Sequence, residues 1–250
     1  MTVLLIGNSL TAGNLGIPYS RYLNFPDDST SEHRLINRGR DGDTLSGVGS
    51  RLEAALKADN PDVLIIQTGA NDILLPEMAS RGGLWTPFVR EMEKRGSIPT
   101  TEPREFSEIY TEMIGRAVSH VVDIRRIICV TIPPIGEVLH SERNRKREVY
   151  NREIRRVIEE TGAKLADVSN AFENILEKIK NPSDWFFGSP GDFTADVKEV
   201  RRGKGAMGLS EERGLYLTID GAHLNERGAE LMGKVISSAI AMETVPRRVR

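Results

Sequence analysis

The sequence predicts an α/β protein, a three-layer α/β/α sandwich on a parallel sheet of about five strands. Short apolar segments alternate along the chain with amphipathic patterns of helical period, as in repeated βα units. Consecutive strands of this kind are joined by crossovers, and crossovers give parallel strands with helices on both faces. A chain of 250 residues is long enough to bury one sizeable core in this arrangement.

The expected strands are five short, mostly apolar segments bounded by turn residues or charges. They are residues 3–6, 35–36, 63–66, 127–131 and 164–168. A strand buried on both faces has no need to alternate apolar and polar side chains, so these continuous runs favour a parallel sheet covered on both sides.

Four expected helices lie after these strands, each with apolar residues at mostly three- and four-residue steps. The sets are Leu45, Val48, Leu52, Ala55 and Leu56; Phe106, Ile109, Met113, Ala117 and Val121; Tyr150, Ile154, Val157 and Ile158; and Leu231, Val235, Ile236 and Ala239. The third set marks the crossover between the fourth and fifth strands. The fourth marks a last helix, and Asn225 before it can cap its first turn.

Two segments depart from this alternation of strands and amphipathic helices. We interpret them as insertions at about 76–103 and 181–214 on a single domain that spans 1–250. Both segments are rich in Gly, Pro and charge, and neither has a long clean period. They also hold both tryptophans and four of the seven phenylalanines of the chain. These aromatic side chains either anchor the insertions as small satellite cores or wall an apolar substrate pocket.

Composition excludes several classes of protein. The net charge of −2 gives no strong field toward nucleic acid or anionic lipid, so we expect neither as a partner. The single cysteine, Cys129, cannot form an internal disulfide. No stretch approaches the roughly 18 apolar residues of a membrane span, and the first residues do not resemble a secretory signal. We therefore expect a cytoplasmic protein, or a secreted one if the sequence is that of a trimmed mature form.

The first candidate for chemistry is Ser9, which directly follows the first strand in Gly7-Asn8-Ser9-Leu10. Ligands of parallel α/β sheets bind beyond the carboxyl ends of the strands, so Ser9 stands at the functional edge. A loop of this kind can also hold phosphate, but the Gly-x-Gly-x-x-Gly pattern is absent. The Gly-x-Ser-x-Gly motif of the nucleophile elbow of α/β-hydrolases is also absent, because Thr11 occupies the place of its second glycine.

A serine nucleophile requires a histidine base and usually a carboxylate that orients it. His33, His120 and His140 have the surroundings of surface or structural residues. His223 differs, because Asp220 precedes it by three positions and one turn can bring this carboxylate to Nδ1. The alternative role of Asp220 is simply to order a turn.

Two further loops at the same edge carry groups that can stabilise negative charge. Asn71, in Gly69-Ala70-Asn71-Asp72 after the third strand, can donate its amide to an oxyanion, or it can form an Asx-turn. Segment 37–44, after the second strand, contains glycines that let a backbone N–H approach a ligand closely, or it is an ordinary surface turn.

The four motifs are, in order, Gly7-Asn8-Ser9-Leu10, Gly42-Asp43-Thr44, Gly69-Ala70-Asn71-Asp72 and Asp220-Gly221-Ala222-His223. Together they resemble the four sequence blocks of the SGNH hydrolases, also called GDSL esterases and lipases. The resemblance spans nearly the whole chain and implies the SGNH hydrolase fold with its flavodoxin-like parallel sheet. It implies that Ser9 is the nucleophile, His223 the general base and then acid, and Asp220 the group that orients His223. The implied oxyanion hole is the backbone N–H of Ser9, the backbone N–H of Gly42 and the side-chain amide of Asn71.

Two features qualify the match. The family's usual Asp before the serine is Asn8 here, which keeps an acceptor oxygen and removes a charge. We expect the loop to survive this change with little effect on the triad. Gly39 is a second candidate for the glycine of the second block, and we prefer Gly42 because Asp43-Thr44 follows it.

The sequence thus predicts a two-step serine esterase that needs no metal or cofactor. Its expected substrates are small-molecule or carbohydrate esters, above all short acyl esters or acetylated carbohydrate, while lysophospholipids and thioesters stay open. One alternative is a flavodoxin-like module that binds phosphate or a nucleotide without turnover. Another is a relative that transfers O-acetyl groups to a sugar instead of water. The oligomeric state stays open.

Overall fold

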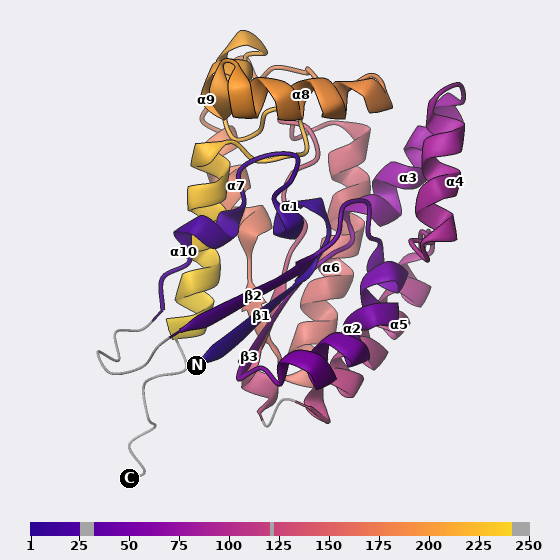
Figure 1. Cartoon of the computed structure of the whole chain (residues 1–250), viewed down its shortest axis with the longest axis vertical. Helices are drawn as coiled ribbons and strands as arrows, with labels where there is room; N and C mark the ends of the chain where they lie inside the picture. The colour runs from indigo at the N-terminus through magenta and orange to yellow at the C-terminus, as the bar shows by residue number, and fades with distance from the viewer. Residues whose placement is uncertain (26–32, 121–122, 242–250) are drawn as a thin grey trace.

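A computed structural model describes residues 1–25, 33–120 and 123–241 of the chain. Its centre is one parallel sheet with strand order β2-β1-β3-β4-β5 (Figure 1). The strands are β1 (Thr2–Gly7), β2 (Arg34–Gly39), β3 (Val63–Gln67), β4 (Ile127–Val130) and β5 (Lys164–Ala166). All four strand pairs are parallel, so the carboxyl ends meet at one edge. The predicted five-stranded α/β sandwich is confirmed.

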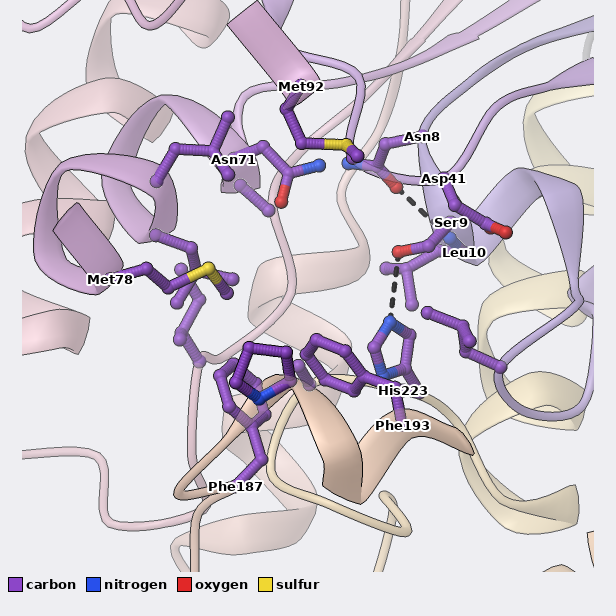
Figure 2. Close-up of a pocket in the computed structure, with 18 of the residues that line it drawn as sticks. Asn8, Ser9, Leu10, Asp41, Asn71, Met78, Met92, Phe187, Phe193 and His223 are labelled. Atoms are coloured by element: carbon purple, nitrogen blue, oxygen red, sulfur yellow. Dashed lines mark hydrogen bonds between the residues drawn. The ribbon is translucent and has the colours of Figure 1, made fainter. Parts of the chain in front are cut away.

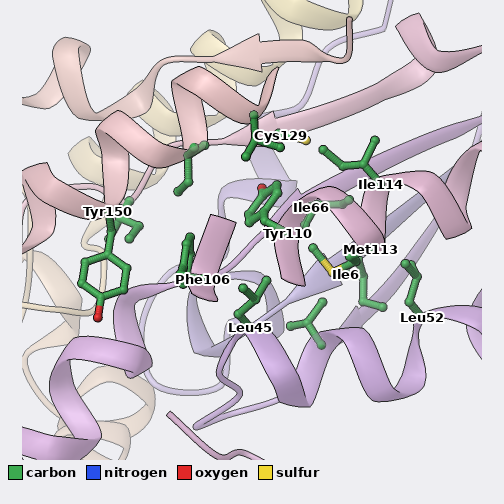
Figure 3. Close-up of a cluster of buried hydrophobic side chains, with 14 of the residues drawn as sticks. Ile6, Leu45, Leu52, Ile66, Phe106, Tyr110, Met113, Ile114, Cys129 and Tyr150 are labelled. Carbon is green, nitrogen blue, oxygen red and sulfur yellow. The ribbon is translucent and has the colours of Figure 1, made fainter. Parts of the chain in front are cut away.

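The central strands are apolar throughout because they bury side chains on both faces. In β1, Leu4 and Ile6 point into one core, and Val3 and Leu5 point into the other. β3 and β4 divide their side chains in the same way. Figure 3 shows part of the first core, where Ile6 and Ile66 lie close to aromatic and aliphatic side chains of the covering helices.

Helices cover the two faces as separate layers (Figure 1). The first face carries α2 (Leu45–Asp59), α5 (Pro103–Val118) and α6 (Glu142–Thr161), and the second carries α7 (Val168–Leu176), α10 (Glu226–Ala241) and the short 3₁₀ helix η1 (Tyr19–Tyr22). A second 3₁₀ turn, η2 (Ile124–Arg126), leads into β4. The four helices predicted from periodicity correspond to α2, α5, α6 and α10. Val121 of the second set lies outside the described residues.

Two strand boundaries differ from the prediction. β2 extends over Arg34–Gly39, where the sequence pattern marks only 35–36, because this edge strand is largely solvent-exposed and its polar residues hide the signal. β5 ends at Ala166, short of the predicted 168. Asp167 accepts the N–H of Asn170 at 3.2 Å and so begins α7 in place of a longer strand.

The two segments without a clean period contain helices. α3 (Ala70–Arg81) runs past Pro76 into the first segment, and α4 (Trp85–Lys94) follows it. The second segment forms α8 (Pro190–Arg202) and α9 (Gly205–Glu212). In Figure 1, α8 and α9 lie over the carboxyl ends of the strands, and the pair α3 and α4 stands beside them. These helices therefore surround the edge where ligands of such sheets bind.

Gly39, at the end of β2, is held by packing against α1 (Ser9–Ala12). A Cβ added at Gly39 would lie 2.1 Å from the backbone nitrogen of Ala12. We expect Gly39→Ala to lower the free energy of unfolding by about 1–3 kcal/mol, because the strand and helix must move apart. Urea denaturation followed by circular dichroism measures this change.

Gly115→Ala provides the matched control, since Gly115 is exposed on α5 and nothing lies within 4 Å of the position of its Cβ. This control should gain about 0.5–1 kcal/mol through helix propensity. Equal stabilities for the two variants would show that Gly39 has no packing role.

Candidate active site

Ser9 lies at the carboxyl end of β1 as the first residue of α1 (Ser9–Ala12). The preceding Asn8 is the N-cap, and its Oδ1 accepts the N–H of Leu10 at 3.1 Å. An asparagine oxygen therefore caps this turn without a charge, as expected for the departure from the family's Asp. Gly13 ends the turn in the left-handed region at φ 72°. The hydroxyl of Ser9 is thereby directed out of the sheet edge.

The structure brings Ser9, His223 and Asp220 into one hydrogen-bonded chain (Figure 2). Nε2 of His223 lies 3.0 Å from Oγ of Ser9, and Nδ1 of His223 lies 2.5 Å from Oδ2 of Asp220. Asp220 is fully buried, and His223 is 6% exposed. This arrangement can withdraw a proton from the serine hydroxyl and stabilise the resulting imidazolium.

A tight turn places the carboxylate against its imidazole. Oδ1 of Asp220 accepts the backbone N–H of Ala222 at 2.9 Å and that of His223 at 2.7 Å. Gly221, between them, has φ +84°, and a Cβ there would lie 2.4 Å from the ring of Phe186. The Asp-x-x-His spacing thus folds into the turn that the sequence allowed, with one carboxylate oxygen left for the imidazole.

The pKa of His223 is raised above its ordinary value of 6.5. Burial by itself lowers this pKa, because it disfavours the charged imidazolium. The charge of Asp220 and its hydrogen bond to Nδ1 raise it and outweigh burial, with smaller contributions from Asp41 and Asp196. The imidazole is therefore a stronger base than a free histidine.

Glu137, in the loop after β4, holds the segment that leads to Asp220. It is buried, and its Oε2 accepts the N–H of Tyr216 at 2.6 Å. Its Oε1 accepts the N–H of Leu217 at 2.8 Å, and both the N–H (2.9 Å) and the hydroxyl (2.8 Å) of Thr218. A single carboxylate thus satisfies three consecutive backbone donors. Sequence reasoning missed this role, because nothing near Glu137 in the sequence indicates a partner some 80 positions away.

Gly42 and Asn71 lie across the cavity mouth from His223. Asn71 is 7% exposed in the first turn of α3, and its amide nitrogen donates one hydrogen bond to the carbonyl of Asp43 at 2.8 Å. A side-chain amide carries a second N–H. Figure 2 shows the amide nitrogen of Asn71 turned toward the side of Ser9. Gly42 has φ +81°, and a Cβ there would lie 2.3 Å from the sulfur of Met92.

Asp43 fixes the loop that carries Gly42. This carboxylate is fully buried and accepts hydrogen bonds from Arg40 (2.7 Å), Ser97 (3.0 Å) and Arg51 (2.6 Å). Arg51 also donates to the carbonyl of Gly7 at 2.9 Å, immediately before the loop of Ser9. The sequence motif contains Asp43, but only the structure reveals that it joins the first two loops of the site.

Asp72 does the same for the loop of Asn71. It is buried, and it accepts the N–H groups of Leu45 and Thr100, each at 2.9 Å. Burial raises the pKa of Asp72 and outweighs these backbone donors, which lower it, so that the resulting pKa is about 7. The starts of α2 and α3 are therefore tied together, which fixes Asn71 relative to Gly42.

A cavity of about 360 Å³ opens beside these groups. Ser9, His223, Gly42 and Asn71 all line it. In Figure 2, Met78, Met92, Phe187 and Phe193 surround the same space. Gly39 does not line it, so the structure favours Gly42 as the glycine of the second loop.

The aromatic side chains of 76–103 and 181–214 serve both roles that the sequence left open. Trp85 is 4% exposed, packs on Phe187 and Phe193, and donates its Nε1 hydrogen to the carbonyl of Gly188 at 3.1 Å. It anchors the two segments to each other. Phe88, Phe187 and Phe193 line the cavity, and Phe193 meets the His223 imidazole edge-on with ring centroids 5.6 Å apart.

His33, His120 and His140 do not line the cavity. Among residues 1–25, 33–120 and 123–241, no group of three or more His, Cys, Asp or Glu side chains is arranged to hold a metal ion. No helix in these ranges is long and apolar enough to cross a membrane. Cys129, in β4, is a free thiol whose side chain is buried in the first core.

The fold and this site are those of an α/β hydrolytic enzyme with serine, histidine and carboxylate at the carboxyl edge of a parallel sheet. The sequence profile of the GDSL-like Lipase/Acylhydrolase family matches residues 5–231, so the chain belongs to this family and is a carboxylic ester hydrolase. The predicted family is confirmed. A comparison with curated proteins finds no match.

Solved structures with the same fold include several esterases. The acetylxylan esterase Axe2 from Geobacillus stearothermophilus is 20% identical, with a TM-score of 0.62 over 99% of this chain and 97% of that one. The acetyl xylan esterase AlAXEase is 20% identical, with a TM-score of 0.64 over 96% and 100%. LAE5, an alpha/beta hydrolase from the metagenome of Lake Arreo, Spain, is 18% identical, with a TM-score of 0.60 over 98% and 96%.

Replacement of Glu137 by Gln tests its role in holding the loop before Asp220. The glutamine keeps one acceptor oxygen but turns an amide N–H toward at least one backbone donor. We expect the free energy of unfolding to fall by about 1–3 kcal/mol, measured by urea denaturation.

Glu142→Gln is the control, because Glu142 is exposed on α6 and its ion pair is with exposed Lys146. It should change stability by less than about 0.5 kcal/mol. If both variants were equally stable, the anchoring role of Glu137 would be excluded.

Proposed function

We propose that the protein hydrolyses carboxylic esters through an acyl-enzyme on Ser9, with His223 as general base and acid and Asp220 as the group that orients His223. The observation that carries this proposal is the chain of hydrogen bonds from Ser9 through His223 to Asp220, at 3.0 and 2.5 Å. Ser9 follows β1 and the pair Asp220 and His223 shares one turn far along the chain, yet Ser9 and His223 both line the cavity.

In the first step, Oγ of Ser9 forms a bond to the ester carbonyl carbon while its proton passes to Nε2 of His223. The resulting tetrahedral intermediate then breaks the carbon–oxygen bond to the alcohol, and His223 returns the proton to the leaving oxygen. The alcohol departs, and the acyl group remains on Ser9. Asp220 stays ionised and stabilises the imidazolium.

In the second step, water takes the place of the alcohol. His223 removes a proton from it as it attacks the acyl carbon, and the same imidazole then protonates Oγ of Ser9 as the acid is released. The raised pKa of His223 favours proton acceptance in both steps.

The backbone N–H groups of Ser9 and Gly42 and the amide of Asn71 form the proposed oxyanion hole. Asn71 is held by its bond to the Asp43 carbonyl, and Gly42 by the network of Asp43, so these donors are fixed before substrate binds. A preorganised donor of this kind is typically worth about 3–4 kcal/mol in the transition state.

Two classes of substrate fit this reaction, namely short acyl esters and acetylated carbohydrate. The names of Axe2 and AlAXEase support the second. The apolar side chains of the cavity support the first. The lining of the cavity disfavours the alternative of a phosphate- or nucleotide-binding module. Among the described residues that line the cavity, Arg95 is the only Lys or Arg, so little positive charge is available to bind phosphate.

Ser9→Ala tests the nucleophile. We expect hydrolysis of 4-nitrophenyl acetate to fall by a factor of at least about 10³, while the circular-dichroism spectrum and the melting temperature stay nearly unchanged. A fluorophosphonate should label the peptide that contains Ser9 in the native protein and leave the variant unlabelled. Ser80→Ala, on the exposed side of α3, is the control and should keep full activity. Retained hydrolysis by the Ser9 variant would refute the assignment.

The pH dependence of kcat/KM tests the pair His223 and Asp220. His223 must be neutral to accept a proton, so activity should rise with pH through a pKa above 6.5. Asp220→Asn removes the charge that raises this pKa and leaves the burial that lowers it, so the rise should move to lower pH. The variant should also lose about 10⁴ in kcat. An unmoved profile would mean that another group controls the titration.

A further inference from the structure

We propose that the side-chain amide of Asn8 is a fourth donor of the oxyanion hole, which makes Asn8 a catalytic residue as well as the cap of α1. This inference rests on the proposed function, because the oxyanion forms only when Ser9 attacks an ester carbonyl. The sequence motif by itself gives Asn8 only an acceptor role, through its side-chain oxygen.

The helix that Asn8 caps fixes the orientation of its amide. Oδ1 of Asn8 accepts the N–H of Leu10 at 3.1 Å. A side-chain amide has an oxygen that accepts hydrogen bonds and an NH₂ group that only donates them. Because only the oxygen can serve the N–H of Leu10, the NH₂ group of Asn8 faces the other way. The cap therefore decides which end of the amide stays available.

The NH₂ group of Asn8 borders the cavity without an acceptor from the protein. Asn8 is 1% exposed, and it lines the cavity beside Ser9. In the part of the chain that the structure describes, no group accepts a hydrogen bond from Nδ2 of Asn8. Nearly all buried polar groups in proteins are paired. An unpaired amide donor at the edge of an open space therefore indicates an acceptor that arrives with the substrate.

The amide lies on the side of Ser9 where negative charge develops. In Figure 2, the hydroxyl of Ser9 lies between His223 on one side and the pair Asn8 and Asn71 on the other. His223 protonates the leaving oxygen, so the carbonyl oxygen of the ester turns away from the imidazole. Figure 2 shows the amide nitrogens of Asn8 and Asn71 on that opposite side. Two side-chain amides thus face the place of the oxyanion.

The start of α1 presents this amide next to another proposed donor. Ser9 is the first residue of α1, and the N–H groups of a first helical turn have no acceptor within their own helix. Asn8 satisfies the N–H of Leu10 with its side-chain oxygen. The N–H of Ser9 and the NH₂ group of Asn8 belong to neighbouring residues, so one short turn supplies both donors.

The backbone holds Asn8 in place before substrate binds. Its N–H donates to the carbonyl of Gln67 at the end of β3, at 3.3 Å. Its carbonyl accepts the N–H groups of Thr11 at 3.1 Å and Ala12 at 2.9 Å. A donor fixed in this way needs no reorganisation when the oxyanion forms, which is what makes such donors effective.

A neutral side chain also suits this position electrostatically. A carboxylate in place of the amide would keep the acceptor for Leu10, but it would donate no hydrogen bond. Its charge would also repel the oxyanion, because like charges at close range disfavour each other. The amide of Asn8 provides the cap and a donor together.

Two substitutions remove the donor and keep a capping oxygen. Asn8→Ser leaves a shorter, uncharged side chain, and Asn8→Asp leaves one of the same shape with a negative charge. We expect kcat for 4-nitrophenyl acetate to fall by about 10²-fold or more in the serine variant, and further in the aspartate variant. In both variants kcat/KM should fall together with kcat, because the lost contact is made only in the transition state.

Inhibition by phenylboronic acid gives a second readout of the same contact. When Oγ of Ser9 forms a bond to boron and its proton passes to His223, the boron becomes a tetrahedral anion that resembles the reaction intermediate. The inhibition constant should therefore rise in both variants, and most in Asn8→Asp, because a contact of the transition state is also a contact of its analogue.

Asn170→Asp is the matched control. It makes the same change from amide to carboxylate on an exposed residue of α7 (Val168–Leu176) that does not line the cavity. This control should leave both kcat/KM and the inhibition constant unchanged. Melting temperatures followed by circular dichroism show whether the Asn8 variants are folded, and Asn8→Ser decides the question if Asn8→Asp does not fold.

A folded Asn8→Ser variant with native kcat/KM and a native inhibition constant would overturn the donor role of Asn8. This holds even if Asn8→Asp were inactive, because charge alone would then explain its loss. Fluorophosphonate labelling of Ser9 in the native protein would still support the proposed function in that case. If the native protein neither hydrolysed the ester nor became labelled, the proposed function itself would fail.

Discussion

The contact on which the structure depends is the hydrogen bond between two side chains 214 positions apart, Oγ of Ser9 and Nε2 of His223. Their separation must be controlled to a fraction of an ångström, although they belong to opposite ends of the chain. The parallel sheet achieves this because β1 lies inside it and delivers Ser9 to the carboxyl edge. The antiparallel bridge of Thr218 and Leu224 then closes the turn that carries Asp220 and His223.

Buried carboxylates are the second organising principle of this edge. Loops lack the ladder of hydrogen bonds that strands provide, so their N–H groups need other acceptors once they are buried. Asp72, Glu137 and Asp220 supply them. Asp43 instead accepts hydrogen bonds from side chains, and each of the four carboxylates accepts at least two hydrogen bonds. Of these four, only Asp220 contacts the imidazole. The other three fix the positions of the loops that carry Gly42, Asn71 and Asp220. Groups remote from the reacting bond therefore contribute much to the geometric precision of the site.

The helices α3, α4 and α8 form walls of the cavity at the carboxyl edge of the sheet. Trp85, Phe187 and Phe193 pack on one another, and the same cluster presents Phe193 to His223. One aromatic cluster therefore both stabilises these segments and packs against the imidazole. This coupling links substrate specificity to the packing of segments that lie outside the sheet, where the fold itself imposes little on the choice of side chain.

The sequence by itself determined the layers, the strand and helix periods of the sandwich, and the candidates Ser9, Asn71, Asp220 and His223, because these follow from local pattern and from motifs after successive strands. Gly42 was preferred over Gly39 by the residues after it, and packing against Ala12 explains why Gly39 is a glycine. Only the tertiary structure decided the edge strand β2, the helices of 76–103 and 181–214, the anchoring by Glu137 and the shape of the cavity. Each of these depends on contacts between residues tens to more than a hundred positions apart, and such contacts leave no periodic signal in the chain.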